Sequence, residues 1–264
     1  MCVADLETKY KELQNALEEQ ILENKKLKSK LKKALVFVPR KDNSHVVREE
    51  FSSLTSSVAL QKLLDDYEFD SVLDIGAGEL LHSQIFANYG KSVTAIDLGT
   101  SIYYDKSHLK EHEKISKIIG NFYDISFEQQ FDLIWLSHVL EHQVNPGTFL
   151  DKVISLAKEN GIIAITVPPL KHNIVGGHVS LWNAGLILYR LVLAKIDCRD
   201  AIILSYGYNI SVIVRKKTIE YLPELQFDAG DIKRIRPYLP DQLDFKPNSN
   251  DDPFDGNIKN LNWK

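Results

Sequence analysis

The chain has 264 residues, of which 26% are charged and 44% are hydrophobic, with 32 basic and 36 acidic side chains. This length suits one catalytic domain with appendages, and the net charge of −4 disfavours a dedicated nucleic-acid-binding protein. With only Cys2 and Cys198 present, a disulfide framework or a cysteine-rich metal site is not expected.

The N-terminal segment predicts a cytoplasmic protein. Its first twenty residues are charged throughout, which argues against a signal peptide. No apolar run in the chain approaches the roughly 20 residues of a membrane-spanning helix. We therefore expect no membrane span and a cytoplasmic location.

Residues 1–35 predict a coiled-coil helix. Neither Gly nor Pro occurs before Pro39, and mostly apolar side chains repeat with heptad spacing. The a positions hold Val3, Tyr10, Leu17, Asn24 and Leu31, and the d positions hold Leu6, Leu13, Gln20, Leu27 and Ala34. An asparagine at an a position favours a parallel two-stranded pairing, so we expect a homodimer. The alternative is an amphipathic helix that folds back on its own domain.

The rest of the chain predicts an α/β domain. Residues 36–70 form a helical cap or linker with one helix over 46–66, and residues 216–264 form a polar, turn-rich tail. Between them, short apolar runs alternate with helical stretches, which indicates a parallel sheet. The expected strands are Val72–Ile75, Val93–Ile96, Lys117–Ile119, Phe131–Leu136 and Ile162–Val167, then Ala201–Tyr206 and Ile210–Val214. The short link between the last two permits only an antiparallel hairpin.

The most informative motif is a glycine turn after the first strand. Asp74-Ile75-Gly76-Ala77-Gly78 runs from a buried strand toward an expected helix over 80–89, and two glycines let the backbone approach a ligand closely. Asp97 ends the second strand, where a carboxylate can bind both hydroxyls of a ribose. Leu81 replaces the third glycine of a dinucleotide motif, and Glu79 would repel a pyrophosphate.

These residues resemble the class I S-adenosylmethionine-dependent methyltransferases over roughly residues 50–215. The matching segments are Val72-Leu73-Asp74-Ile75-Gly76-Ala77-Gly78, Ile96-Asp97, Gly120-Asn121-Phe122 and Phe131-Asp132-Leu133-Ile134-Trp135-Leu136-Ser137-His138-Val139-Leu140-Glu141-His142. The resemblance implies a doubly wound, Rossmann-like, mostly parallel sheet of seven strands over residues 71–215. It implies S-adenosylmethionine as cofactor, held by Asp74, Gly76, Ala77, Gly78, Asp97, Leu98, Asn121, Phe122, Ser137 and His138.

Within this set, the resemblance assigns separate parts of the cofactor to separate residues. Gly76–Gly78 would cradle its amino-acid part, and Asp97 would bind its ribose. Asn121 and Phe122 would contact the adenine, although many relatives have Asp where this chain has Asn121. Ser137 and His138 would border the methionine moiety and the methyl group.

Candidate catalytic residues follow the fourth and fifth strands. His138, Glu141 and His142 would share one helix face, as a metal site, an acid/base pair or a packing contact. Because the spacing offers no further ligand, no metal is expected. In the expected acceptor-pocket insertion over 168–200, two glycines precede His178. We expect His178 as general base, with His142 and Glu141 next; the alternative is that His178 caps a helix over Ser180–Leu193.

The acceptor is the least determined feature. Arg48 and Lys171, together with His45 and His172, could meet an anionic acceptor or form a solvated face, and Trp182 could stack on a sugar or pack in the core. The overall plan resembles bacterial methyltransferases of polysaccharide loci, which implies a sugar hydroxyl, on a nucleotide-linked hexose or heptose for capsule or O-antigen. The alternatives are an N-methyltransferase acting on an amino sugar or phosphorylated amine, and a non-catalytic coiled-coil scaffold.

Overall fold

The computed structural model describes residues 11, 20, 47–101, 104, 112–247 and 251–264. The chain divides into two compact units, residues 1–44 and 45–264, and the account below concerns the second. The predicted coiled coil and dimer of residues 1–35, and the candidate His45, lie outside the described residues.

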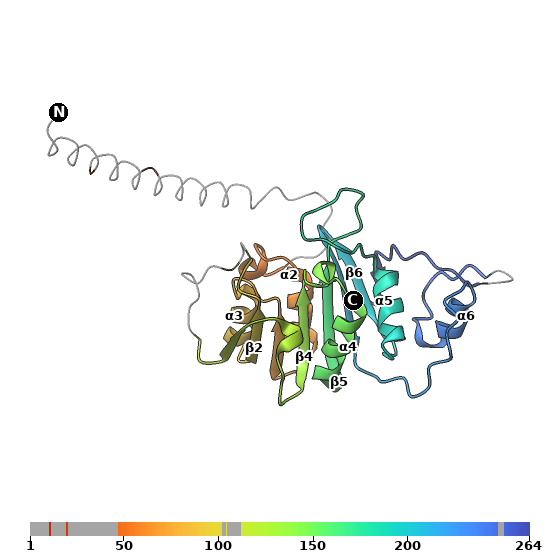
Figure 1. Ribbon diagram of the computed structural model, residues 1–264, viewed down its shortest axis with the longest axis horizontal. Coiled ribbons are helices and arrows are strands. Elements are labelled where there is room, and N and C mark those ends of the chain that lie inside the picture. The colour runs from red at the N-terminus through yellow and green to blue at the C-terminus, as the bar shows by residue number, and fades with distance from the viewer. Residues whose placement is uncertain (1–10, 12–19, 21–46, 102–103, 105–111, 248–250) are drawn as a thin grey trace. The chain divides into compact units, whose positions relative to one another are not determined.

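The second unit is built on an eight-stranded sheet in the order β3-β2-β1-β4-β5-β7-β6-β8 (Figure 1). The strands are β1 Ser71–Ile75, β2 Ser92–Asp97, β3 Ile115–Ile119, β4 Phe131–Ser137, β5 Ala157–Val167, β6 Ile202–Tyr206, β7 Asn209–Arg215 and β8 Asn260–Leu261. Strands β1 to β5 are mutually parallel, and β7 runs antiparallel to both of its neighbours. The predicted parallel sheet with an antiparallel hairpin is confirmed, and β8 is an additional edge strand.

Helices cover both faces of this sheet. The α-helices are α2 Ser57–Asp66, α3 Leu81–Asn88, α4 Pro146–Leu156, α5 Ala184–Leu193 and α6 Asp231–Ile235, and the 3₁₀ helices are η1 Glu49–Phe51, η3 Phe122–Asp124, η4 Leu140–His142 and η5 Arg236–Tyr238. Successive residues of β4 alternate between two buried clusters: Ile134 packs with α4 and α5, and Trp135 packs with α2 and α3. This period of two follows from the strand pleat and accounts for the near-continuous apolar runs in the sequence.

One predicted helix, residues 46–66, is divided in the structure. A short η1 is followed by α2, which begins only at Ser57. Ser56 has a left-handed conformation with φ of 56°, which interrupts a right-handed helix. Ser56 is fully buried, and its Oγ lies 2.7 Å from Ser137 Oγ, so contacts with the sheet hold this conformation.

The C-terminal segment, to which the sequence assigned no structure, packs against the sheet. Ile219, Ile235, Leu239, Leu243 and Leu261 join the cluster under α4 and α5, and Trp263 joins the other. Strand β8 pairs with the outer edge of β6, Leu261 opposite Ile203. Among the described helices, none is both long and apolar enough to cross a membrane.

The parallel strands bring their carboxyl ends to one edge of the sheet. Ile75 at the end of β1 pairs with Ile96 and Leu136, and Asp97 at the end of β2 pairs with Ile119. The loops that leave these strands therefore meet at the same edge, which is where open α/β sheets bind ligands.

Candidate functional site

The glycine turn after β1 is shaped by close packing on one side and open space on the other. Gly76 and Gly78 have φ of +73° and +51°, a region that favours glycine. A Cβ on Gly76 would lie 2.4 Å from Cγ2 of Val139, whereas a Cβ on Gly78 would have no atom within 4 Å. Gly76 thus fits the turn against the segment after β4, and Gly78 leaves the adjoining space clear for a ligand.

The carboxylate of Asp97 fixes this turn by hydrogen bonds. Its Oδ2 accepts a hydrogen bond from the Gly78 amide at 2.9 Å, and its Oδ1 accepts one from the Gly99 amide at 2.8 Å. Each carboxylate oxygen has a second lone pair, so Asp97 can still accept hydrogen bonds from hydroxyls. Beside it, Leu98 is 59% exposed and Ile119 is 51% exposed. A carboxylate next to an exposed apolar surface suits a ribose joined to a flat base.

Asp74 lies beneath the turn rather than at its surface. Its side chain is buried, and Oδ2 accepts a 2.6 Å hydrogen bond from Ser83 Oγ on α3. Burial, together with the negative charge of Asp97, raises the pKa of Asp74 to about 7, although the Ser83 bond opposes the shift. Asp74 therefore connects β1 to α3 under the turn.

Asn121 and Phe122 begin the short helix η3 after β3. Asn121 caps it: Oδ1 accepts from the Tyr123 amide at 3.2 Å, and Nδ2 donates to Asp124 Oδ2 at 3.0 Å. The Phe122 ring is buried and packs edge-on against Phe149, so its side chain is part of the core. Asn121 remains exposed at the ligand-binding edge of the sheet.

His138, which follows β4, is held from three sides. Its backbone has φ of +56°, and its amide donates to the Thr166 carbonyl at 2.8 Å. Its Nε2 lies 2.9 Å from Asn209 Oδ1, and its Nδ1 lies 3.2 Å from Glu141 Oε1. Burial lowers the pKa of His138, but the contacts with Glu141 and Asn209 outweigh it, so the net pKa is raised. The contact with Glu141 therefore favours the protonated form of His138.

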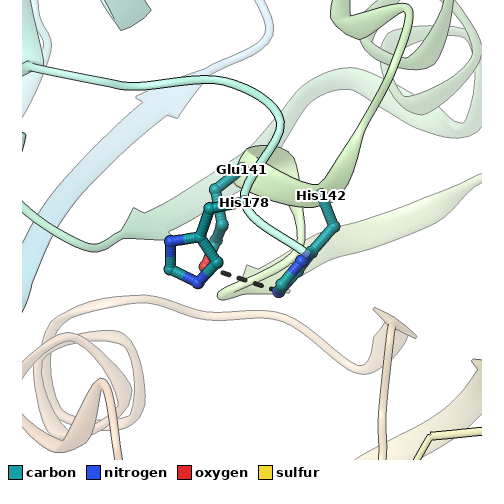
Figure 2. Close-up of side chains that lie close together, drawn as sticks. All are labelled: Glu141, His142 and His178. Atoms are coloured by element: carbon teal, nitrogen blue, oxygen red, sulfur yellow. Dashed lines mark ion pairs between the residues drawn. The ribbon is translucent and has the colours of Figure 1, made fainter. Parts of the chain in front are cut away.

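Glu141, His142 and His178 form a cluster at this edge (Figure 2). Helix η4 carries Glu141 and His142, and the loop after β5 brings in His178. One donor atom from each side chain lies within 4.8 Å of the other two. Glu141 Oε1 is 3.9 Å from His142 Nε2, and the two imidazole rings are nearly perpendicular with centroids 5.0 Å apart. The sequence grouped Glu141 with His142 and named His178 apart from them, and the fold brings all three together.

Gly177 explains the glycine pair that precedes His178. With φ of +80°, it brings its carbonyl oxygen to 2.8 Å from His142 Nδ1. A Cβ at this position would lie 3.2 Å from the same nitrogen. The glycine therefore permits the close contact that orients His142.

The proposed helix-capping role of His178 is wrong. Helix α5 begins at Ala184, and its N-cap is Asn183, whose Oδ1 accepts from the Leu186 amide at 2.8 Å. His178 lies five residues before that cap and is half-buried in the cluster.

The candidate acceptor residues separate into two groups. Trp182 is 2% exposed, packs in the hydrophobic core and donates from Nε1 to Ser180 Oγ, so little of its ring is available to a sugar. Arg48 pairs with Asp65 and lies over aromatic rings, which commits its guanidinium elsewhere.

Lys171 instead lies at a small pocket in the loop after β5, with its Nζ 4.2 Å from the ring centroid of Tyr208. His178 and Tyr208 also line this pocket, and His172 is exposed beside it. The Tyr208 ring also stacks against that of His138. Sequence reasoning missed Tyr208, for which the signal was an aromatic residue in the predicted hairpin turn.

The two glycines of the turn can be distinguished by substitution. Gly76→Ala should lower the free energy of unfolding by about 2 kcal/mol or more, because it adds a clash with Val139 to the strain of a positive φ. Gly78→Ala, which meets only the strain, is the matched control and should cost about 1 kcal/mol. Urea denaturation measures both, and equal losses would contradict the assigned packing.

Asp74 should make stability depend on pH. Its pKa is about 7 in the folded protein and 3.8 when the side chain is unperturbed, as in the unfolded chain, so the native state binds more protons between these values. Stability should therefore fall as pH rises from about 4 to about 7, on the order of 1 kcal/mol per pH unit at most, and level off above.

Asp74→Asn should remove that part of the slope. Urea denaturation of both proteins at pH 5 and pH 8, without added ligand, tests this expectation. An unchanged difference between the two pH values in the variant would show that Asp74 is not the group responsible.

Comparison with known proteins agrees with this geometry. Residues 73–165 match the family model described as a methyltransferase domain. The ubiquinone biosynthesis O-methyltransferase of Rhodopseudomonas palustris is 31% identical over 100 residues, covering 36% of this chain and 38% of that protein. That of Rickettsia conorii is 30% identical over 128 residues, covering 46% and 44%. The chain thus spans less than half the length of these curated relatives.

Among solved structures, human N-acetylserotonin methyltransferase in complex with S-adenosylmethionine superposes with a TM-score of 0.50 at 19% identity, over 62% of this chain and 53% of that one. This likeness concerns the fold. Residues 73–165 therefore resemble a methyltransferase domain, and they lie within a Rossmann-like sheet of eight strands.

Proposed function

We propose that this protein transfers the methyl group of S-adenosylmethionine to a hydroxyl group of a small molecule. The observation that carries the proposal is the packing of Gly76 on Val139. This contact places the glycine turn, which we expect to hold the cofactor, beside the segment that bears Glu141 and His142. The name of the curated relatives, O-methyltransferases, supports transfer to oxygen.

The residues at the sheet edge fit the cofactor. Gly78 leaves room for its amino-acid part, Asp97 has lone pairs for ribose hydroxyls, and Leu98 offers an apolar surface to the base. When bound, S-adenosylmethionine supplies an activated methyl group that leaves sulfur in an in-line displacement. The protein must then align the acceptor and take its proton.

Proton removal favours a hydroxyl acceptor. An alcohol has a pKa of about 16, near that of water, so its oxygen needs a base or a metal ion. An amine only needs to arrive neutral, and would not require the cluster. His178 is half-buried at the acceptor pocket and is our first candidate for the base; His142 is second. The acceptor O–H proton would pass to the imidazole as the new O–C bond forms and the S–C bond breaks.

The side chains at the proposed acceptor pocket favour an anionic, ring-shaped substrate. Lys171 supplies a positive charge above the Tyr208 ring, and His172 is exposed nearby. Aromatic faces suit flat or ring-shaped groups, and a lysine suits a phosphate. We propose a nucleotide-linked sugar as acceptor, for capsule or other surface polysaccharide. An amino sugar or a phosphorylated amine is the second candidate, because the same lysine would bind its phosphate.

A transfer assay with radiolabelled S-adenosylmethionine tests this function against nucleotide sugars, phosphorylated amines and phenols. Asp97→Ala should weaken cofactor binding at least tenfold, about 1.4 kcal/mol, because it removes the ribose acceptor and the brace of the turn. Asp151→Ala, an exposed carboxylate on α4, is the matched control. Isothermal titration calorimetry gives both dissociation constants.

The outcomes separate the alternatives. Failure of the wild-type protein to bind S-adenosylmethionine at millimolar concentration would favour a non-catalytic scaffold. Binding with transfer only to amines would establish the second candidate. An unchanged dissociation constant for Asp97→Ala would contradict the ribose assignment.

We also propose that residues 1–35 join two copies in a parallel coiled coil, on the heptad pattern and Asn24. Deleting residues 1–35 should yield monomers by sedimentation while leaving cofactor affinity unchanged, because the glycine turn and Asp97 belong to the other unit. A dimer that survives the deletion would refute this assignment.

A further inference from the structure

The carboxylate of Glu141 is the most unusual group at the sheet edge. Its side chain is 1% exposed, and within the described part of the chain neither oxygen has a hydrogen-bond partner. The groups nearest Oε1 are His138 Nδ1 at 3.2 Å and His142 Nε2 at 3.9 Å. Burial of a carboxylate without full pairing is costly, so this group points to a ligand that completes its surroundings.

His142 presents a free lone pair toward that carboxylate. A carbonyl oxygen can only accept, so the 2.8 Å contact with Gly177 O requires that His142 Nδ1 carry the proton. Nε2, the nitrogen nearer Glu141, then has its lone pair available. An imidazole whose second nitrogen donates to a backbone carbonyl is the usual arrangement of a metal-binding histidine.

His178 supplies the third donor. Figure 2 shows its ring beside the carboxylate of Glu141 and the ring of His142. Each of the three residues offers a donor atom, all within 4.8 Å. Tetrahedral ligation at about 2.0–2.2 Å separates donors by about 3.5 Å, so the side chains must close by about an ångström. His142 is 43% exposed and His178 is half-buried, which leaves both rings room to do so.

We propose that Glu141, His142 and His178 bind one divalent transition-metal cation, with Zn²⁺ as the best match. Two imidazole nitrogens and one carboxylate suit Zn²⁺ and its first-row neighbours, whereas Mg²⁺ and Ca²⁺ take oxygen ligands. His138 contacts the carboxylate from the side and orients it. The sequence alone did not predict a metal because it offered no ligand beyond His138, Glu141 and His142, and His178 is that ligand.

The role of the cation rests on the proposed function. Three protein ligands leave a coordination position for an acceptor hydroxyl, whose pKa a bound cation lowers. The O–H proton then passes to solvent, the oxygen takes the methyl group, and the sulfur keeps the electron pair of the broken S–C bond. In this form of the reaction, His142 and His178 are ligands in place of free bases.

Cobalt binding to the full-length, chelator-treated protein tests the site without cofactor or acceptor. Co²⁺ should produce a visible absorption that saturates at one equivalent and is displaced by Zn²⁺. His178→Ala and the nearly isosteric Glu141→Gln should each weaken Co²⁺ binding at least tenfold. His172→Ala, an exposed histidine of the same loop, is the matched control and should bind as the wild-type protein does.

The absence of a saturable one-equivalent signal, or unchanged binding by His178→Ala, would overturn the site. Because His178 lies on a surface loop, its variant tests the site even if Glu141→Gln fails to fold. Calorimetry with S-adenosylmethionine on the metal-free protein separates the two proposals. Cation binding without methyl transfer to any acceptor would overturn the function alone, and full transfer activity in chelator would overturn the cation's role.

Discussion

The contact between Gly76 and Val139 determines how the two halves of the site meet. One residue ends the first strand and the other follows the fourth, and these strands are neighbours in the sheet. Their closeness requires a position without a side chain, and any larger residue at 76 would push the glycine turn away from Val139. In the methyl transfer that we propose, alignment of the acceptor with the cofactor would depend on this distance.

Glu141 organises the acceptor side in a comparable way. Its side chain faces His138 and His142, while its backbone carbonyl accepts hydrogen bonds from the amides of Val179 and Ser180. One residue thereby fixes both η4 and the loop that carries His178. The Gly177 carbonyl adds a second link between the same two segments. The acceptor loop is thus joined to the end of β4 by main-chain bonds, which do not depend on the acceptor.

The strands and the glycine turn could be predicted because their signals are local. Apolar runs mark the buried strands, and the spacing from Gly78 to Asp97 places a carboxylate beside the turn. Features that depend on long-range contacts could not be predicted. Helix α2 starts late where Ser56 contacts Ser137, and Trp182 is buried in a core cluster made of residues far apart in the sequence.

The cluster shows the same limit at the site. Spacing identified Glu141 and His142 as neighbours, yet the approach of His178 depends on a loop about 35 residues further along the chain. A hydrogen bond between His142 Nδ1 and the Gly177 carbonyl joins the two segments. Tyr208 was missed because its importance arises only when the β6–β7 turn meets His138. The sequence pattern thus identified the chemistry, whereas the tertiary contacts select which groups act together.

Strand β8 protects an edge of the sheet that would otherwise be open to other chains. An uncovered edge strand offers unpaired amides and carbonyls to other chains and promotes aggregation. β6 would present such an edge, but the two residues of β8 cover part of it, and Trp263 closes the adjoining core. A fragment that ends at residue 215, where the methyltransferase resemblance stops, would expose the edge of β6 and the part of the core that Trp263 covers. The segment needed for solubility therefore extends well beyond the segment that carries the chemistry.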